Sequence, residues 1–162
     1  MLGKISKVLK NQKGFTLVEL MTVLIILGVI LGIGVPKYLQ VQAKAEWEAD
    51  EATIRNFAKA AETYAASINK YSDVALSELD TAGIIDTDIV LNRINDGSNN
   101  SIKNTGTETT PPQAVKANDQ TFKFNQETGN VNNLGEVVCK LIGKPPYGDS
   151  PTYPNDTVEA GW

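Results

Sequence analysis

The feature that most constrains the fold is an apolar run from Phe15 to Val35, in which Glu19 is the single charge among 21 residues. A helix of that length spans about 31 Å, which matches a hydrocarbon core of about 30 Å. Residues 1–14 carry four lysines and no acid. Lysines ahead of an apolar helix keep that end in the cytoplasm. The pattern therefore predicts a basic leader, a membrane helix over residues 15–36 and an external remainder.

Two other kinds of segment share this hydropathy. A secretory signal peptide has a shorter apolar core followed by a small-residue cleavage site of the A-x-A kind, and residues 36–40 read PKYLQ. A plain single-pass anchor explains the hydropathy but not an acid one turn into the helix. Because a carboxylate in lipid is costly, Glu19 is a candidate functional residue. Thr16 to Glu19 also fits the S/T-x-x-E capping box, in which Glu19 would only satisfy backbone donors.

The eight residues from Lys13 to Leu20, KGFTLVEL, lie between the basic leader and the apolar helix. They resemble the processing motif of type IV pilins and the related pseudopilins. The resemblance implies that a prepilin peptidase cleaves between Gly14 and Phe15 and that Phe15 becomes N-methylated. It also implies that Glu19 pairs with the N-terminal amine of a neighbouring subunit during assembly.

Physical chemistry supports that role, since an amine and a carboxylate in an apolar filament core gain most by meeting each other. Glu19 lies four residues after Phe15 and could also reach its own amine. The sequence leaves the pair within one subunit and the pair between subunits open, and the family resemblance favours the latter.

A weak point is predicted in the same helix, where three glycines and a proline fall within nine residues. Their summed cost is roughly 6 kcal/mol relative to alanine. In the family this stretch can melt on assembly, where neighbouring subunits satisfy the unwound backbone. The alternative is a close-packing surface for another membrane helix. Both interpretations require a partner, and we expect a helix that is interrupted near Pro36. The residues of this predicted soft spot are Gly28, Gly32, Gly34 and Pro36.

Residues 37–71 contain no glycine or proline, and their apolar residues recur at spacings of seven, three and four. This period predicts an amphipathic helix with one stripe that packs on the rest of the chain. The stripe consists of Trp47, Ile54, Phe57, Ala61, Tyr64, Ile68 and Tyr71. Its other faces carry charges that indicate a solvated surface with pairs four residues apart, some of them available for contacts between subunits. These charges are Lys44, Glu46, Glu48, Asp50, Glu51, Arg55, Lys59 and Glu62.

Residues 72–162 are predicted to form a globular head. We expect a short helix over residues 86–95, an irregular loop over 95–120, a strand over 121–124 and a second strand over 136–142. The proline-rich tail after Lys144 should be an extended cover over the sheet or disordered. The predicted fold class is α+β, a long N-terminal helix packed against a small antiparallel sheet, as in the pilin fold.

Composition narrows the function. The chain has no histidine, and Cys139 is its single cysteine, so histidine-based catalysis, the usual zinc sites and an intrachain disulfide are excluded. Loss of the four leader lysines would leave 11 basic against 19 acidic residues, a net charge of −8. No nucleic-acid partner, cofactor or metal is expected.

The two leading functions are a type IV pilus subunit and a pseudopilin of a secretion or DNA-uptake machine; an enzyme is disfavoured. Expected partners are further copies of the chain in a helical homopolymer, the prepilin peptidase, an inner-membrane assembly platform and, before assembly, the membrane. We expect a single-pass membrane protein that later reaches an extracellular pilus.

Overall fold

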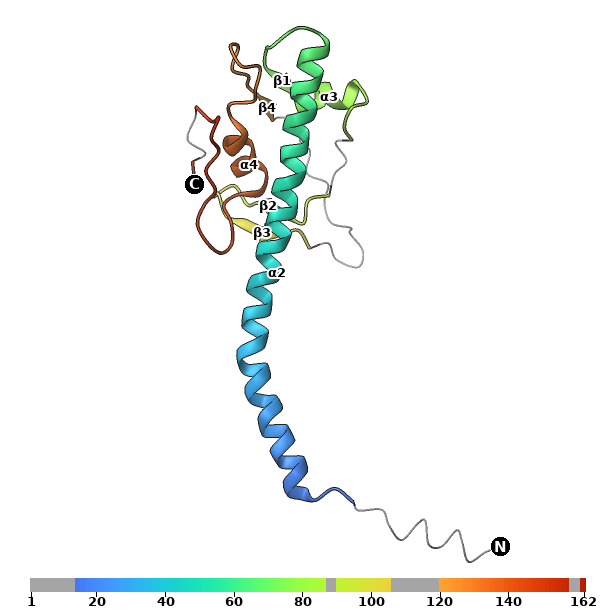
Figure 1. The fold of residues 1–162 in the computed structure, drawn as a ribbon, viewed down its shortest axis with the longest axis vertical. Coiled ribbons are helices and arrows are strands. Elements are labelled where there is room, and N and C mark those ends of the chain that lie inside the picture. The colour runs from blue at the N-terminus through green and yellow to red at the C-terminus, as the bar shows by residue number, and fades with distance from the viewer. Residues whose placement is uncertain (1–13, 87–89, 106–119, 158–160) are drawn as a thin grey trace, which may run out of the picture. The chain divides into compact units, whose positions relative to one another are not determined.

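The computed structural model describes residues 14–86, 90–105, 120–157 and 161–162. The predicted leader before Gly14 and residues 106–119 of the predicted loop lie outside the described residues. The fold class is confirmed as α+β, with a long N-terminal helix and small antiparallel sheets (Figure 1). In chain order the elements are α2 (Leu17–Ser67), β1 (Val74–Ala75), α3 (Leu76–Thr81), β2 (Arg93–Asn95), β3 (Ser101–Lys103), β4 (Thr121–Phe122) and α4 (Leu134–Ile142).

Helix α2 differs from the prediction at two places. It continues through Pro36, so the expected interruption is wrong: a proline removes one backbone hydrogen bond, and the helix carries that loss. It also ends at Ser67 rather than near Tyr71. Asn69 adopts a left-handed conformation with φ of 50°, and Lys70 N–H donates to Ala65 O at 3.0 Å, which is a Schellman end.

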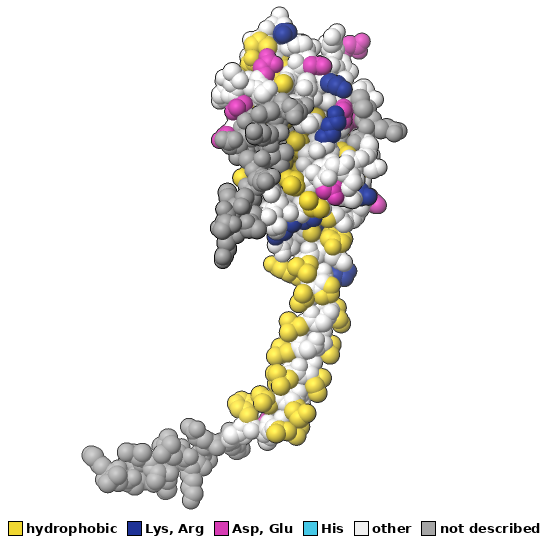
Figure 2. Space-filling view, turned by 180° about the vertical axis from the view of Figure 1, so that it is seen from behind, with side chains coloured by type: hydrophobic (Ala, Val, Ile, Leu, Met, Phe, Trp, Pro, Cys, Tyr) yellow, Lys and Arg dark blue, Asp and Glu magenta, His cyan; other side chains and the backbone are white. Residues whose placement is uncertain are grey.

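The chain divides into two compact units, residues 1–39 and 40–162. In the described part of the first unit, the aliphatic side chains of α2 are all exposed, and they appear as the yellow spheres along this segment in Figure 2. The second unit contains the hydrophobic core. Helix α2 thus exposes its apolar residues in the first unit, whereas in the second unit it buries apolar residues in the core.

In the second unit, one face of α2 is buried through small side chains. Ala58, Ala61 and Ala65 follow Ile54 at helical spacing and are nearly inaccessible to solvent. Alanine has no side chain beyond Cβ, so the elements that cover α2 can approach its backbone closely. The core residues opposite include Val74, Leu76, Leu79, Phe122, Val137, Val138 and Ile142.

The sheets consist of two separate antiparallel pairs. In one pair Val74 of β1 lies opposite Phe122 of β4, and in the other Ile94 of β2 lies opposite Ile102 of β3. The predicted strand over 121–124 is therefore present as β4. The helix predicted over 86–95 is wrong, because its last residues form β2, and β3 lies within the region predicted as an irregular loop.

The second strand, predicted over residues 136–142, is also wrong, because this segment is helix α4. Val137, Val138, Leu141 and Ile142 are buried together on one side, and this spacing is helical. Glu136 lies on the other side and pairs with Lys140 one turn later, at 2.6 Å. The β-branched residues that suggested a strand are here the core face of a helix.

Candidate processing and assembly site

The predicted processing junction lies just outside the start of α2. Gly14, Phe15 and Thr16 are not helical, and the Phe15 side chain is 89% exposed. A Cβ atom built on Gly14 would have no described neighbour within 4 Å. The junction is therefore an exposed, non-helical segment that a peptidase active site could reach.

Thr16 and Glu19 form the capping box that the sequence offered as an alternative role for Glu19. The Thr16 N–H donates to Glu19 Oε2 at 2.9 Å, and the Thr16 hydroxyl donates to the same oxygen at 2.9 Å. The Glu19 N–H donates in turn to Thr16 Oγ1 at 3.2 Å. Two orphan backbone donors of the helix start are thereby satisfied. The box holds the exposed carboxylate beside residue 16, one residue after Phe15.

Among the described residues, α2 is the one helix that is long and apolar enough to cross a membrane. None of its most apolar stretch of 18 residues is buried within the structure. Exposed aliphatic side chains continue along it from Leu17 to Val35. A surface of this extent is unfavourable in water and requires lipid or protein around it.

The residues of the predicted soft spot are helical in this structure. Cβ atoms built on Gly28, Gly32 and Gly34 would meet no neighbour within 4 Å. The side of the helix at these glycines is therefore open to a partner, and Pro36 follows within the same helix. Whether the stretch unwinds on assembly stays a prediction.

The stripe predicted for residues 37–71 is divided by the structure. Trp47 and Ile54 are buried, and Phe57 and Tyr64 are half-buried against the core. Ile68 and Tyr71 follow the end of the helix and are more than a third exposed. The alanines of α2 take much of the core contact that the sequence prediction assigned to the larger side chains.

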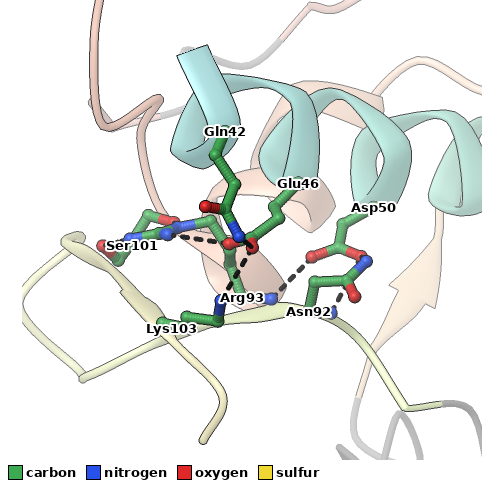
Figure 3. Close-up of polar contacts among 7 residues, drawn as sticks. All are labelled: Gln42, Glu46, Asp50, Asn92, Arg93, Ser101 and Lys103. Atoms are coloured by element: carbon green, nitrogen blue, oxygen red, sulfur yellow. Dashed lines mark hydrogen bonds and ion pairs between the residues drawn. The ribbon is translucent and has the colours of Figure 1, made fainter. Parts of the chain in front are cut away.

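A polar cluster between α2 and the β2–β3 hairpin was missed at the sequence level. We call it the hairpin anchor: Gln42, Glu46 and Asp50 of α2, with Asn92, Arg93, Ser101 and Lys103 (Figure 3). Asp50 is only 2% exposed and accepts hydrogen bonds from Asn92 N–H at 3.0 Å, Asn92 Nδ2 at 2.9 Å and Arg93 N–H at 2.7 Å. Burial raises the pKa of Asp50, and the bonds from Asn92 and Arg93 act against that rise.

Glu46 is the second carboxylate of the hairpin anchor. It accepts from Lys103 Nζ at 2.9 Å and from Gln42 Nε2 at 3.0 Å, and Arg93 Nη1 lies at 3.4 Å. The hydrogen bond from Lys103 is the main reason why the pKa of Glu46 is below its usual value. Arg93 is itself fixed by Ser101, whose hydroxyl and carbonyl oxygens accept from Nε and Nη2. The available sequence signal was the spacing of Gln42, Glu46 and Asp50 by one helical turn.

No group of three histidine, cysteine, aspartate or glutamate side chains that could hold a metal ion occurs among the described residues. Cys139 is buried in α4, and burial raises the pKa of its thiol. Neither feature adds a chemical site to the junction and the apolar helix.

Comparison with known proteins supports the resemblance of the N-terminal segment to a processing motif. The model of the prokaryotic N-terminal methylation motif matches residues 9–35. The chain is 28% identical over 72 residues to the type IV major pilin protein PilA of Myxococcus xanthus (strain DK1622), which covers 44% of the chain. The matched region spans 33% of the length of that relative. No solved structure gives a significant match.

The methylation motif coincides with the exposed junction, the capping box and the apolar helix described above. The long helix with small antiparallel sheets is consistent with the pilin fold. The chain thus carries a prokaryotic N-terminal methylation motif at the start of its long apolar helix, and it is similar to a type IV major pilin over 44% of its length.

Proposed function

We propose that this chain is a structural subunit of a type IV pilus, assembled into an extracellular filament that serves adhesion, motility or surface attachment. The observation that carries the proposal is the exposed apolar first part of α2 with Glu19 in its first turn, next to the junction of Gly14 and Phe15. Such a helix needs lipid before assembly and other subunits after it.

The proposed sequence of events follows from the charges. The precursor resides in the membrane through residues 15–36, and a prepilin peptidase removes residues 1–14. Cleavage creates an amine at Phe15, which is then methylated. In the apolar interior of a filament this cation and the Glu19 carboxylate stabilise each other, because each is costly there alone.

The inner-membrane assembly platform would pass the processed subunit from lipid into a helical homopolymer. The exposed aliphatic side chains of α2 would then contact other copies of α2, and the open sides of Gly28, Gly32 and Gly34 would allow close approach. The similarity to a major pilin favours a pilus over a pseudopilus.

Intact-mass spectrometry of sheared cell-surface material tests processing and export together. We expect the mass of residues 15–162 plus one methyl group. A precursor, or a mature chain present only in the membrane fraction, would contradict the pilus and favour a pseudopilin or an anchored domain.

The role of Glu19 is tested separately with Glu19→Ala and the isosteric Glu19→Gln. Both variants should be cleaved and both should be absent from sheared filaments, because assembly depends on the charge. Glu48→Ala is the matched control, since Glu48 is an exposed glutamate of the same helix that pairs with Lys44 at 3.7 Å. Normal filaments from Glu19→Gln would remove the charge of Glu19 from the mechanism.

A further inference from the structure

The C-terminal tail crosses the head and contacts three elements that are far away in the sequence. We call its described residues Tyr153–Thr157, with Gly161 and Trp162, the C-terminal strap. Figure 1 shows the tail, in red, beside α4. Among the described residues of the strap only Tyr153 is buried, and Trp162 is half-buried against the core.

The first contact of the strap is with one row of α2. The Tyr153 hydroxyl donates to Glu51 Oε1 at 3.1 Å, and the Arg55 guanidinium lies 4.8 Å from the centre of the Tyr153 ring. Burial, then the Glu51 charge, raises the pKa of Tyr153, so the hydroxyl keeps its proton. The centre of the Trp162 ring lies 6.4 Å from the ring centre of Trp47 and 6.4 Å from that of Tyr153.

The second contact is with the start of α4. The Asp156 carboxylate accepts the N–H groups of Leu134 and Gly135, which are orphan donors of the first helical turn. The Thr157 N–H donates to Asn132 O at 2.9 Å, just before the helix. A Cβ atom on Gly135 would lie 2.6 Å from both Asp156 and Tyr153, so the strap occupies the space that a side chain would need.

The third contact is with the turn between β2 and β3, where Asn99 Nδ2 donates to Gly161 O at 2.7 Å. All three contacts are non-covalent, since Cys139 is the single cysteine.

The residues that the strap covers also form hydrogen bonds and ion pairs that do not involve the strap. Trp47 Nε1 donates to Gly143 O at 3.0 Å, and Arg55 pairs with Glu51 at 2.6 Å.

A segment with little buried surface, whose partners are held independently, opens at a lower free energy than the whole domain. We propose that the C-terminal strap opens and recloses as one unit while the rest of the head stays folded. Opening would uncover the Glu51 carboxylate and the first amides of α4. The inference does not depend on the proposed function, because it concerns the head alone.

Native-state hydrogen exchange by NMR on the full-length chain in detergent micelles tests the proposal. The amides of Leu134, Gly135 and Thr157 report on the strap. Those of Val137 and Gly143, which donate to Asn133 O and Cys139 O, report on the hydrogen bonds at the two ends of α4 itself. We expect the three strap amides to exchange with similar protection, at least tenfold below that of the two helix amides.

Trp162→Ala should raise exchange of all three strap amides together, by about tenfold, and leave Val137 and Gly143 unchanged. Trp162 accepts a hydrogen bond from none of these amides, so a common response means a common opening. Asn155→Ala, an exposed position in the strap, is the control and should change nothing. Tyr153→Phe, which removes only the bond to Glu51, is the milder variant if Trp162→Ala fails to fold.

Three results would overturn the proposal. One is equal protection of the strap and helix amides in the unchanged protein. Another is a Trp162→Ala effect on every amide alike, which means that the strap opens only on global unfolding. The third is a response of Thr157 without Leu134 and Gly135, or the reverse, because the strap would then not be a unit.

Discussion

The Asp50 carboxylate accepts the backbone N–H of Arg93 at 2.7 Å across 43 positions of sequence. The same side chain accepts the Asn92 backbone N–H through its other oxygen. Two successive amides at the start of β2 therefore depend on one buried side chain of α2. This relationship is a polar attachment of the hairpin to the helix, beside the buried Leu91.

Asp50→Ala should destabilise the head by about 3 kcal/mol, because buried backbone donors lose their acceptor. That corresponds to a decrease in Tm of about 10 °C for a domain of this size. The decrease in Tm is measured by thermal unfolding in micelles, monitored through the near-ultraviolet circular dichroism of the tryptophans. Asp50→Asn keeps one acceptor oxygen but turns its Nδ2 donor toward the N–H on the other side, so it should also destabilise the head, though less than Asp50→Ala. An unchanged Tm for Asp50→Ala would mean that the hairpin is not held by this carboxylate.

Two rows of side chains on α2, each spaced by four residues, organise the second unit. Glu46 and Asp50 contact the β2–β3 hairpin, and Gln42 donates to Glu46 one turn away, as Figure 3 shows. Trp47, Glu51 and Arg55 contact the C-terminal strap. Residues four apart lie on one face of a helix. The charges that the sequence assigned to a solvated face thus include a buried Asp50 and half-buried Glu46 and Glu51.

The pH dependence of stability should differ between wild type and Glu46→Gln. The pKa of Glu46 is below its ordinary value of 4.5, mainly through the bond from Lys103. A lowered native pKa means that the carboxylate stabilises the fold above the unfolded pKa, and that this contribution is lost as pH falls through the native pKa. Urea midpoints of the two proteins should differ at pH 7 and converge well below pH 4.5. A difference between the two urea midpoints that grows as the pH falls would contradict the stabilising role of the Glu46 carboxylate.

The sequence predicted the long helix and the capping box because both depend on nearby residues. Thr16 and Glu19 are three positions apart, and the apolar run is continuous. Segments whose conformation depends on distant residues were mispredicted. α4 begins where Asp156 accepts the N–H of Leu134, 22 residues away. Strand β2 begins where Asp50 reaches it from α2, and no local pattern contains either contact.

Gly143 and Gly83 form a matched pair for a steric prediction. Their φ angles are 66° and 68°, so alanine is strained at both positions. Gly143 also has a ψ angle of −169°, a backbone conformation that almost only glycine adopts. A Cβ on Gly143 would also lie 2.8 Å from the backbone carbon of Asn100, whereas Gly83 has open space around it. Gly83→Ala should cost about 1 kcal/mol, and Gly143→Ala about 3 kcal/mol or more.

Denaturant midpoints of the two glycine variants, converted with a common slope, give the comparison. The excess cost of Gly143→Ala measures the close approach of α4 to the β2–β3 turn together with the backbone strain at Gly143. Equal costs would contradict both contributions.

Gly14→Ala should leave an uncleaved precursor in the membrane. The structure makes this a clean test, because a methyl group on Gly14 meets no described atom and Gly14 lies outside α2, so the substitution should not disturb folding. A block in processing would then reflect recognition of the junction. Gly28→Ala is the control: its position is equally open, alanine favours the helix, and cleavage should proceed. Intact-mass spectrometry of both variants distinguishes the outcomes, and a mature Gly14→Ala protein of unchanged mass would show that the peptidase does not require glycine before Phe15.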